Sequence, residues 1–431
     1  MHVDKLKHVP RLWPFVAWSQ PHGWGRQSCL QAAFQAAVDT EQTVRRHFLR
    51  LRVSQHRGAK PEKFVQKQEG GLKPAFSQDW LPHERPKSSC GKAALCDHQR
   101  MTPAHQPYDA LLVVSFGGPE QQEDVIPFLE NVLRGKNVPR ERMLEVAEHY
   151  RHFGGKSPIN QQTRALIAAL EEELAAHGPN LTVYWGNRNW HPMLADTVRQ
   201  MQTAGVRKAM AFATSAFGSY SGCRQYLEDI DRARAAVGPG APEIHKFPTF
   251  HNRPGFIRAM ADRVQTALDA IPVERRAAAT LAYTAHSVPL SMARSSPYVE
   301  QLQESCKLVS QAVGREGALV YQSRSGPPSQ PWLEPDVCQH IRELHAGGVT
   351  DIVLAPIGFL SDHMEVVYDL DTEAAQLCRE LGVNLSRAST VGVHPAFISM
   401  LREMIAERMD GSAPSDECRP GCCVPPARPR P

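Results

Sequence analysis

Residues 351–373 read DIVLAPIGFLSDHMEVVYDLDTE and join an apolar run to a row of carboxylates. The apolar part, residues 351–359, is typical of a strand buried on both faces of a parallel sheet. Open α/β sheets bind their ligands just past the carboxyl ends of such strands. The segment therefore predicts an α/β fold with a functional site that begins where this strand ends.

The carboxylates of this segment, Glu365, Asp369 and Glu373, follow one another at every fourth residue. On a helix over residues 363–381 they would share one face. Neighbouring like charges cost a few tenths of a kcal/mol per pair when exposed and more when buried, so a bound cation or protons in transit would offset that cost. The plainer alternative is an acidic face that is simply solvated.

The rest of the body alternates short apolar runs with amphipathic helices, which is the pattern of βαβ units. A break near residues 265–279 separates two sets of strands and predicts two similar halves. The expected strands are Ala110–Phe116, Leu181–Trp185, Ala209–Thr214, Thr280–Thr284, Ala318–Gln322 and Ile352–Ile357. The other expected helices are Arg164–Leu174, Phe256–Leu268, Tyr298–Val313 and Ile398–Met409.

The turn after the first strand, FGGPE at residues 116–120, lacks the Gly-x-Gly-x-x-Gly pattern of dinucleotide-binding folds. The sequence also contains no Walker, Gly-x-Ser-x-Gly or His-Glu-x-x-His motif. A dinucleotide site is therefore not expected.

Length and composition indicate a globular protein, because 431 residues with 42% hydrophobic content can form two or three domains with real cores. No apolar run approaches the roughly 18 residues of a membrane span. The N-terminus, MHVDK, lacks the apolar core of a secretory signal. We expect a cytoplasmic protein with no transmembrane segment and no nucleic-acid partner, and attachment to a membrane surface is left open.

The first 100 residues differ from the body, with 17 Lys and Arg against 8 Asp and Glu and with four of the seven Trp. Three interpretations fit: translated sequence upstream of a start at Met101, a disordered or accessory extension, or an organelle-targeting peptide. The length and the Trp and Pro content suit a targeting peptide poorly. The short polar leader after Met101 favours the first interpretation, and residues 1–106 are taken as an extension outside the folded halves.

The Pro-rich tail, residues 411–431, carries Cys418, Cys422 and Cys423. They are either exposed thiols or ligands of a metal or iron–sulfur site, since a disulfide is disfavoured in the cytosol. Three thiolates are one short of the usual four, and Cys223 in a loop-like segment is the best fourth candidate. The remaining cysteines of the body lie in apolar helical patterns and are expected in the core: Cys306, Cys338 and Cys378.

His286 also follows an apolar strand, in the segment TAHSVP at residues 284–289. A lone His is usually structural. This one stands at the carboxyl end of a strand in the second half, where it can face Glu365. A His opposite carboxylates, with no further His or Cys nearby, indicates a metal site with few protein ligands and low affinity. Such a site can transfer a divalent ion instead of retaining it.

At this point the chain from about Tyr108 to Met409 resembles a known family, ferrochelatase, the enzyme that inserts the metal at the end of haem synthesis. The resemblance is carried in order by LVVSFGGP (112–119), HFGGKSPI (152–159), TAHSVP (284–289), YQSRSGP with PWL (321–327 and 331–333), and PIGF (356–359) continued through Glu373. It implies two Rossmann-like halves, each a doubly wound parallel sheet, over residues 107–265 and 266–410. The halves would enclose a chelatase-like cleft for a porphyrin.

The resemblance also implies roles at the site. His286 and Glu365 match the family's metal-site pair, where Fe²⁺ enters the ring and two pyrrole protons leave. A His can accept a proton near neutral pH, and Glu365 can hold the His, receive the proton or contact iron. Asp369 and Glu373 would form a relay for departing protons or arriving hydrated iron.

The porphyrin itself would lie between aromatic walls and have its propionates held by polar side chains. Each aromatic can instead be an ordinary core residue. The expected walls are Phe116, Tyr220 and Trp332, and the expected propionate ligands are Ser157, Arg151 and Arg188.

Two departures from the family pattern matter. Some members carry at the position of Phe116 a Tyr that can ligate iron. Phe116 has no oxygen and cannot fill this role, and Tyr220 is the candidate for it. Many members hold a [2Fe–2S] cluster with one internal and three C-terminal Cys, a plan that Cys223 and the tail thiols resemble, but the tail spacing is not that of the animal enzymes.

The substrate implied is protoporphyrin IX or coproporphyrin III. The segments YSGCRQY (220–226) and SFGGPE (115–120) resemble actinobacterial-type sequences, in which coproporphyrin is used, and the lack of a hydrophobic membrane lip fits the tetracarboxylate slightly better. One alternative is a cobalt or nickel chelatase for sirohydrochlorin, which would be expected to be shorter and richer in His ligands. Another is a non-catalytic porphyrin or haem carrier. Retention of His286 and Glu365 argues against a carrier, which removes no proton.

Overall fold

The structure, a computed structural model, describes residues 108–136, 138–326, 329–413 and 421–425. The predictions for residues 1–106 and for Cys418 therefore lie outside the described residues.

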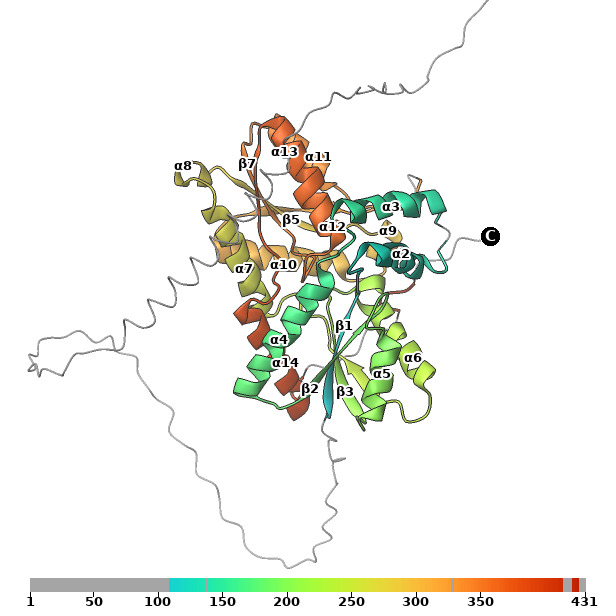
Figure 1. Cartoon of the computed structure of the whole chain (residues 1–431). Helices are drawn as coiled ribbons and strands as arrows, with labels where there is room; N and C mark the ends of the chain where they lie inside the picture. The colour runs from blue at the N-terminus through green and yellow to red at the C-terminus, as the bar shows by residue number, and fades with distance from the viewer. Residues whose placement is uncertain (1–107, 137, 327–328, 414–420, 426–431) are drawn as a thin grey trace, which may run out of the picture. The chain divides into compact units, whose positions relative to one another are not determined.

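Two parallel four-stranded sheets form the framework (Figure 1). The first has the strand order β2-β1-β3-β4 and the second β6-β5-β7-β8, so both halves share one topology. The strands are β1 (Ala110–Ser115), β2 (Thr182–Asn187), β3 (Lys208–Ala213), β4 (Glu243–Lys246), β5 (Thr280–His286), β6 (Gly317–Gln322), β7 (Asp351–Ala355) and β8 (Asn384–Arg387). The predicted class of two similar Rossmann-like α/β halves is confirmed.

The inner strands are the apolar ones. β1 and β7 are buried along their whole length, as continuous apolar runs in a parallel sheet should be. The edge strands β4 and β8 were not predicted, because EIHK and NLSR are short and polar. A polar edge strand gives little periodic signal and discourages pairing with other chains.

Helices cover both sheets. They are α2 (Val125–Leu133), α3 (Arg140–His152), α4 (Ile159–His177), α5 (Leu194–Thr203), α6 (Gln225–Val237), α7 (Pro254–Asp269), α8 (Val273–Arg276), α9 (Leu290–Arg294), α10 (Tyr298–Val313), α11 (Val337–Ala346), α12 (Met364–Val366), α13 (Ala375–Leu381) and α14 (Pro395–Asp410). A 3₁₀ turn, η1 (Gln122–Asp124), and two π-helices, η2 (Tyr220–Arg224) and η3 (Val367–Ala374), complete the described set.

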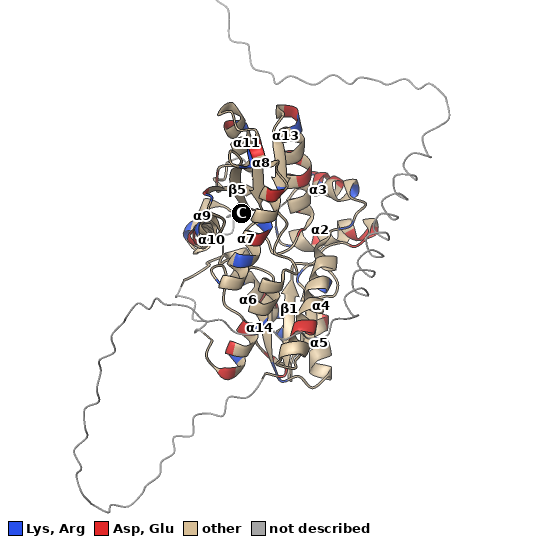
Figure 2. Ribbon diagram, turned by 90° about the vertical axis from the view of Figure 1, so that its left-hand side faces the viewer, with Lys and Arg blue, Asp and Glu red and all other residues tan. Residues whose placement is uncertain are grey.

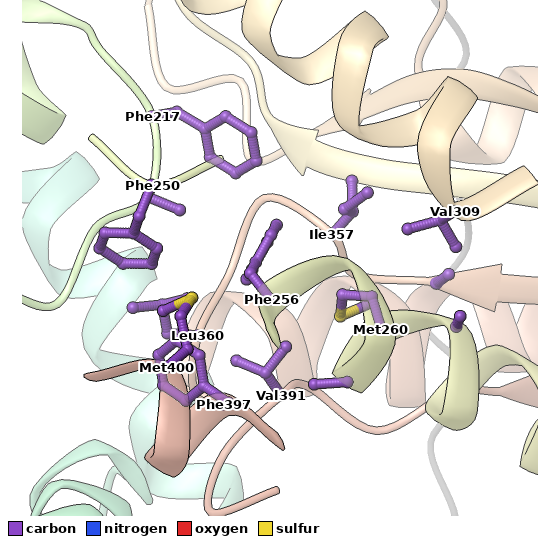
Figure 3. Close-up of a cluster of buried hydrophobic side chains, with 14 of the residues drawn as sticks. Phe217, Phe250, Phe256, Met260, Val309, Ile357, Leu360, Val391, Phe397 and Met400 are labelled. Atoms are coloured by element: carbon purple, nitrogen blue, oxygen red, sulfur yellow. The ribbon is translucent and has the colours of Figure 1, made fainter. Parts of the chain in front are cut away.

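The largest apolar core is shared by the two halves (Figure 3). Phe212 of β3 and Phe250 pack against Phe397 of α14. Phe256 of α7 meets both Phe250 and Phe397 edge-on. The boundary predicted between residues 265 and 266 falls inside α7, a continuous helix that packs on β7, α10 and α14.

The helix predicted over residues 363–381 is not one α-helix. It consists of α12, the π-helix η3 and α13, and η3 carries Asp369 and Glu373. A wider turn keeps residues four apart close to one face, so the predicted alignment of the carboxylates does not need an α-helix. π-turns of this kind occur often at functional sites.

Charged residues of both signs occur along helices such as α3 (Figure 2). Among the residues that the structure describes, no helix is both long and apolar enough to cross a membrane.

Candidate active site

His286 and Glu365 meet at the carboxyl end of the second sheet. His286 is the last residue of β5, and Glu365 lies in α12, which follows β7. β5 pairs with β7, so both residues emerge at one sheet edge. His286 Nε2 lies 3.4 Å from Glu365 Oε2, and the two side chains remain 33% and 52% exposed.

The two groups form an ion pair. His286 Nδ1 contacts the backbone carbonyl of Ser287, which can only accept, so Nδ1 carries a hydrogen and Nε2 is the nitrogen that titrates. Desolvation lowers the pKa of His286. The charge of Glu365 and its hydrogen bond raise this pKa by more than desolvation lowers it, so the net shift is upward. Desolvation likewise raises the pKa of Glu365, yet His286 brings it down to about 2.

Asp369 is held at the end of β6 by two donors. Ser323 Oγ donates to Asp369 Oδ2, and Gln322 Nε2 donates to the same oxygen at 3.3 Å. Ser323 has φ 62°, in the left-handed region that a non-glycine residue occupies at a cost. Desolvation is the main reason that the pKa of Asp369 rises to about 7, and the bond from Ser323 opposes the rise.

Glu373 lies at the far end of the row and is exposed. Desolvation, and after it the charge of Asp336, raises the pKa of Glu373. The row therefore connects the His286 pair with solvent.

The first half of the molecule lies against the carboxylate segment of the second. Met364, which precedes Glu365, is buried in a cluster with Phe128 and Tyr150. His149 of α3 stacks on Tyr368 of η3, with ring centroids 3.7 Å apart and planes at 7°. α2 and α3 thus cover this side of the site (Figure 1).

Comparison with known proteins shows the family of the chain. A model of the ferrochelatase family matches residues 108–409. A ferrochelatase of Rhodopirellula baltica is 56% identical over 330 residues, which cover 74% of this chain and 94% of that protein. The chain belongs to the ferrochelatase family.

A second relative and one solved structure are also similar to this chain. The coproporphyrin III ferrochelatase of Nocardia farcinica is 49% identical over 344 residues, covering 74% of this chain and 98% of that protein. Among solved structures, the sirohydrochlorin chelatase SirB from Bacillus subtilis subspecies spizizenii, in complex with cobalt, is similar with a TM-score of 0.42 and 15% identity. That match covers 70% of this chain and 97% of SirB.

The aromatic residues predicted to line the ferrochelatase cleft lie in different settings. Phe116, just after β1, is 37% exposed and meets Phe128 edge-on. Trp332 is half-buried and its indole packs on Gly326. A Cβ added to Gly326 would lie only 2.4 Å from Trp332 Nε1. Tyr220 lies in η2, where its hydroxyl donates to Glu228 at 3.1 Å. Phe116 is the most exposed of the three.

The predicted propionate ligands also differ in availability. Ser157 is buried beside Gly118, just before α4. Arg151 is exposed on α3 and paired with Glu148. Arg188 is 5% exposed, forms an ion pair with Asp229 and stacks 4.4 Å from the Tyr226 ring. The guanidinium of Arg188 is thus already engaged within the first half.

The cysteines fall into two groups. Cys306 and Cys378 are buried in the core and Cys338 packs half-buried against it, in agreement with the prediction. Cys422 and Cys423 bring their sulfurs to 3.3 Å. The described residues contain no group of three or more His, Cys, Asp and Glu side chains placed to hold a metal.

The Cys223 turn and the tail both contact α9. The backbone N–H of Cys423 donates to the carbonyl of Ser295, the residue after α9, at 2.9 Å. Ser221, in the η2 turn that carries Cys223, lies 4.0 Å from the sulfur of Met292 in α9. The two turns therefore approach the same short helix.

Two site residues were missed by the sequence reasoning. His363 caps α12, accepting from the backbone N–H of Glu365 at 3.2 Å, and its only sequence signal is its place two residues before Glu365. Desolvation and the charge of Arg188 lower the pKa of Lys136, whereas the charge of Glu365 raises it, so Lys136 is within electrostatic range of both Arg188 and Glu365. Nothing in the pattern around Lys136 marks it.

A cavity of about 330 Å³ opens beside the site, lined by Phe153, Lys156, Pro158, Gln161, Met364 and Val367. Its lining includes neither His286 nor Glu365, so it is a neighbouring space and not the reaction centre.

Proposed function

We propose that this protein inserts Fe²⁺ into a porphyrin with release of two protons, as a step of haem synthesis. The observation that carries the proposal is the His286–Glu365 ion pair at the carboxyl edge of the second sheet, in a chain of the ferrochelatase family. Iron is the substrate here, not a resident cofactor.

The chemistry needs a base on one face of the ring, because each pyrrole N–H must lose its proton before the nitrogen can bind iron. His286 Nε2 is the base. It can accept a pyrrole proton only when the imidazole is neutral, after Nε2 has released the proton it carries in the imidazolium form. Glu365 is ionised and orients the imidazole, stabilises the imidazolium that forms, and can contact the incoming cation. Proton transfer by a positioned side chain typically contributes a factor of about 10² to 10⁴.

Asp369 and Glu373 provide the path between this pair and solvent. Asp369 has a pKa of about 7, so it gains and loses a proton readily at neutral pH. Glu373 is exposed and can exchange protons or hydrated iron with water. Carboxylate oxygens suit a transit path, because they bind hard cations without holding them tightly.

Coproporphyrin III is the favoured porphyrin. Relatives 47–50% identical to this chain are named coproporphyrin III ferrochelatases. A tetracarboxylate needs more cationic partners than protoporphyrin IX, and exposed cations are present at Lys136, Arg151 and Lys156. Phe116 and Trp332 would form the aromatic walls, with Ser157 near a propionate. Tyr220 and Arg188, already bound to Glu228 and Asp229, would have to change partner to take up the roles predicted for them.

A [2Fe–2S] cluster would be held by Cys223, Cys422 and Cys423 with Cys418. It is supported by the approach of both cysteine turns to α9 and by the 3.3 Å between the sulfurs of Cys422 and Cys423. When bound, such a cluster supplies thiolate–iron bonds that would fasten the tail to the first half. The cytoplasmic location stays a prediction from the sequence.

The test is an anaerobic insertion assay with Fe²⁺ and each porphyrin, with sirohydrochlorin and Co²⁺ as the competing pair. Wild-type protein should metallate coproporphyrin III faster than protoporphyrin IX. His286→Ala and Glu365→Ala should each lose about 100-fold in rate. Insertion only into sirohydrochlorin, or none at all, would reject the proposal, and full activity in both variants would reject the site.

A further inference from the structure

Gln162 of α4, in the first half, binds Asp362 in the second half through both ends of its amide. The backbone N–H of Asp362 donates to Gln162 Oε1 at 2.8 Å, and Gln162 Nε2 donates to Asp362 Oδ2 at 3.4 Å. The two residues are 200 positions apart in the sequence. One side chain therefore fixes both the backbone and the carboxylate of Asp362.

The other carboxylate oxygen of Asp362 is held from a different direction. Arg387, the last residue of β8, donates to Asp362 Oδ1 at 3.1 Å, and both side chains are about four-fifths buried. The same guanidinium also donates through Nε to Asp371 in η3. Asp362 is thus bound by a side chain of α4 at its backbone N–H and one carboxylate oxygen, and by a side chain of β8 at the other oxygen.

Asp362 leads directly into the reaction centre. The next residue, His363, accepts the backbone N–H of Glu365 at 3.2 Å and so defines the start of α12. Only two residues separate Asp362 from Glu365. A shift of the backbone at Asp362 therefore moves Glu365 relative to His286, and misplacement of a catalytic group by about 1 Å can cost about 100-fold in rate.

The first turn of α4 is itself anchored to the turn after β1. Asn160 Nδ2 donates to the carbonyl of Gly118 at 3.0 Å, and Asn187 Nδ2 donates to Asn160 Oδ1 at 3.3 Å. Gly118 lies two residues after Phe116. The turn that places Phe116 and the segment that places Glu365 are therefore connected through α4.

We propose that Gln162 is a positioning residue for metal insertion: it holds Asp362 so that Glu365 stands at a fixed place relative to the porphyrin wall of the first half. The inference rests on the proposed function. Gln162 does not touch the reacting atoms, and its effect is exerted through Asp362 and His363.

The experiment compares Gln162→Met, which keeps length and loses both bonds, with Gln162→Glu, which sets a second carboxylate against Asp362. Gln200→Met is the matched control, because Gln200 of α5 is exposed in the same half of the molecule. Each protein is assayed with Fe²⁺ and coproporphyrin III well below its own melting temperature. Porphyrin affinity is measured separately by fluorescence titration.

Both Gln162 variants should lose at least about tenfold in kcat while porphyrin Kd stays within about twofold, and Gln200→Met should match wild type. A residue that only stabilises the fold would lower the melting temperature and leave kcat of the folded protein unchanged. That result, or normal kcat in both Gln162 variants, would overturn the inference alone. Wild-type protein that inserts no iron would overturn the proposed function together with it.

Discussion

His286 Nε2 faces Glu365 Oε2 at 3.4 Å, while His286 Nδ1 is committed to the carbonyl of Ser287. The imidazole is therefore protonated on both nitrogens until the pH exceeds its raised pKa, and only the deprotonated ring can act as the base. Insertion rate should rise as the pH is raised above about 6.5, the ordinary value for His. Glu365→Gln removes the anion that raises the pKa, so the acid limb of the pH–rate profile should move to lower pH and the maximal rate should fall. An acid limb at the same pH in this variant would contradict the assignment.

Asp369 should make the protein less stable as the pH rises. Its pKa is about 7 in the folded protein against an ordinary 3.8. Between these values the folded state keeps a proton that the unfolded state has released, so the free energy of unfolding falls with rising pH across that window. Asp369→Asn should remove this fall and raise the melting temperature at pH 8 but not at pH 4. The measurement is thermal unfolding at a series of pH values, and identical pH dependence in both proteins would refute the prediction.

Ser323 offers a way to separate stability from activity. Its φ of 62° suits glycine, whereas its hydroxyl holds Asp369. Ser323→Gly and Ser323→Ala should lose similar activity, about tenfold, because both lack the donor. The Gly variant should be more stable than the Ala variant by about 1 kcal/mol in chemical denaturation. Ser325→Gly, an exposed site in the same loop, should leave the insertion rate unchanged. Equal stability of the Ser323 variants, or undiminished activity, would count against this account.

Arg188 and Asp229 form a buried pair whose disruption should be costly. Asp229→Ala leaves the guanidinium without its partner and should reduce the free energy of unfolding by about 3 kcal/mol. If the pair is purely structural, the porphyrin KM of the remaining folded enzyme should not change. A rise in porphyrin KM would instead show that Arg188 contributes to substrate binding, as the sequence predicted.

Cys423 tests the cluster. Wild-type protein purified without oxygen should show the visible absorption of a [2Fe–2S] centre, and Cys423→Ser should lose it. Cys338→Ser is the matched control, since Cys338 packs against a buried apolar cluster of the second half that includes Ile352 and Leu370. No absorption in wild-type protein after reconstitution would reject the cluster.

The sequence predicted the inner strands and the helices α4, α7, α10 and α14, because continuous apolar runs and helical spacing leave a strong periodic signal. It did not predict β4 and β8, whose polar residues pair only along one side. Nor did it predict that residues 367–374 form a π-helix, since π-helices are rare and occur mostly as single turns within α-helices, so that helical spacing is read as an α-helix.

For the site, the residue types alone pointed to His286 and Glu365, because both follow strands of one sheet and their chemistry is complementary. The residues that hold the site in place were not predicted. Gln162 reaches Asp362 and Ser323 reaches Asp369 across long stretches of chain, and such bonds depend on how helices and loops pack. Sequence spacing carries no record of that packing.

What the sequence determined by itself is the pair of parallel sheets and the chemical groups placed at their carboxyl ends. Local periodicity and strand polarity suffice for this, since parallel strands bring their ends to one edge. Only the tertiary structure decided that Arg188 is paired with Asp229 and that Ser323 donates a hydrogen bond to Asp369. It also decided that α4 connects the two halves at Asp362. These features arise from contacts between segments whose separation in the chain is too great for any local pattern to encode.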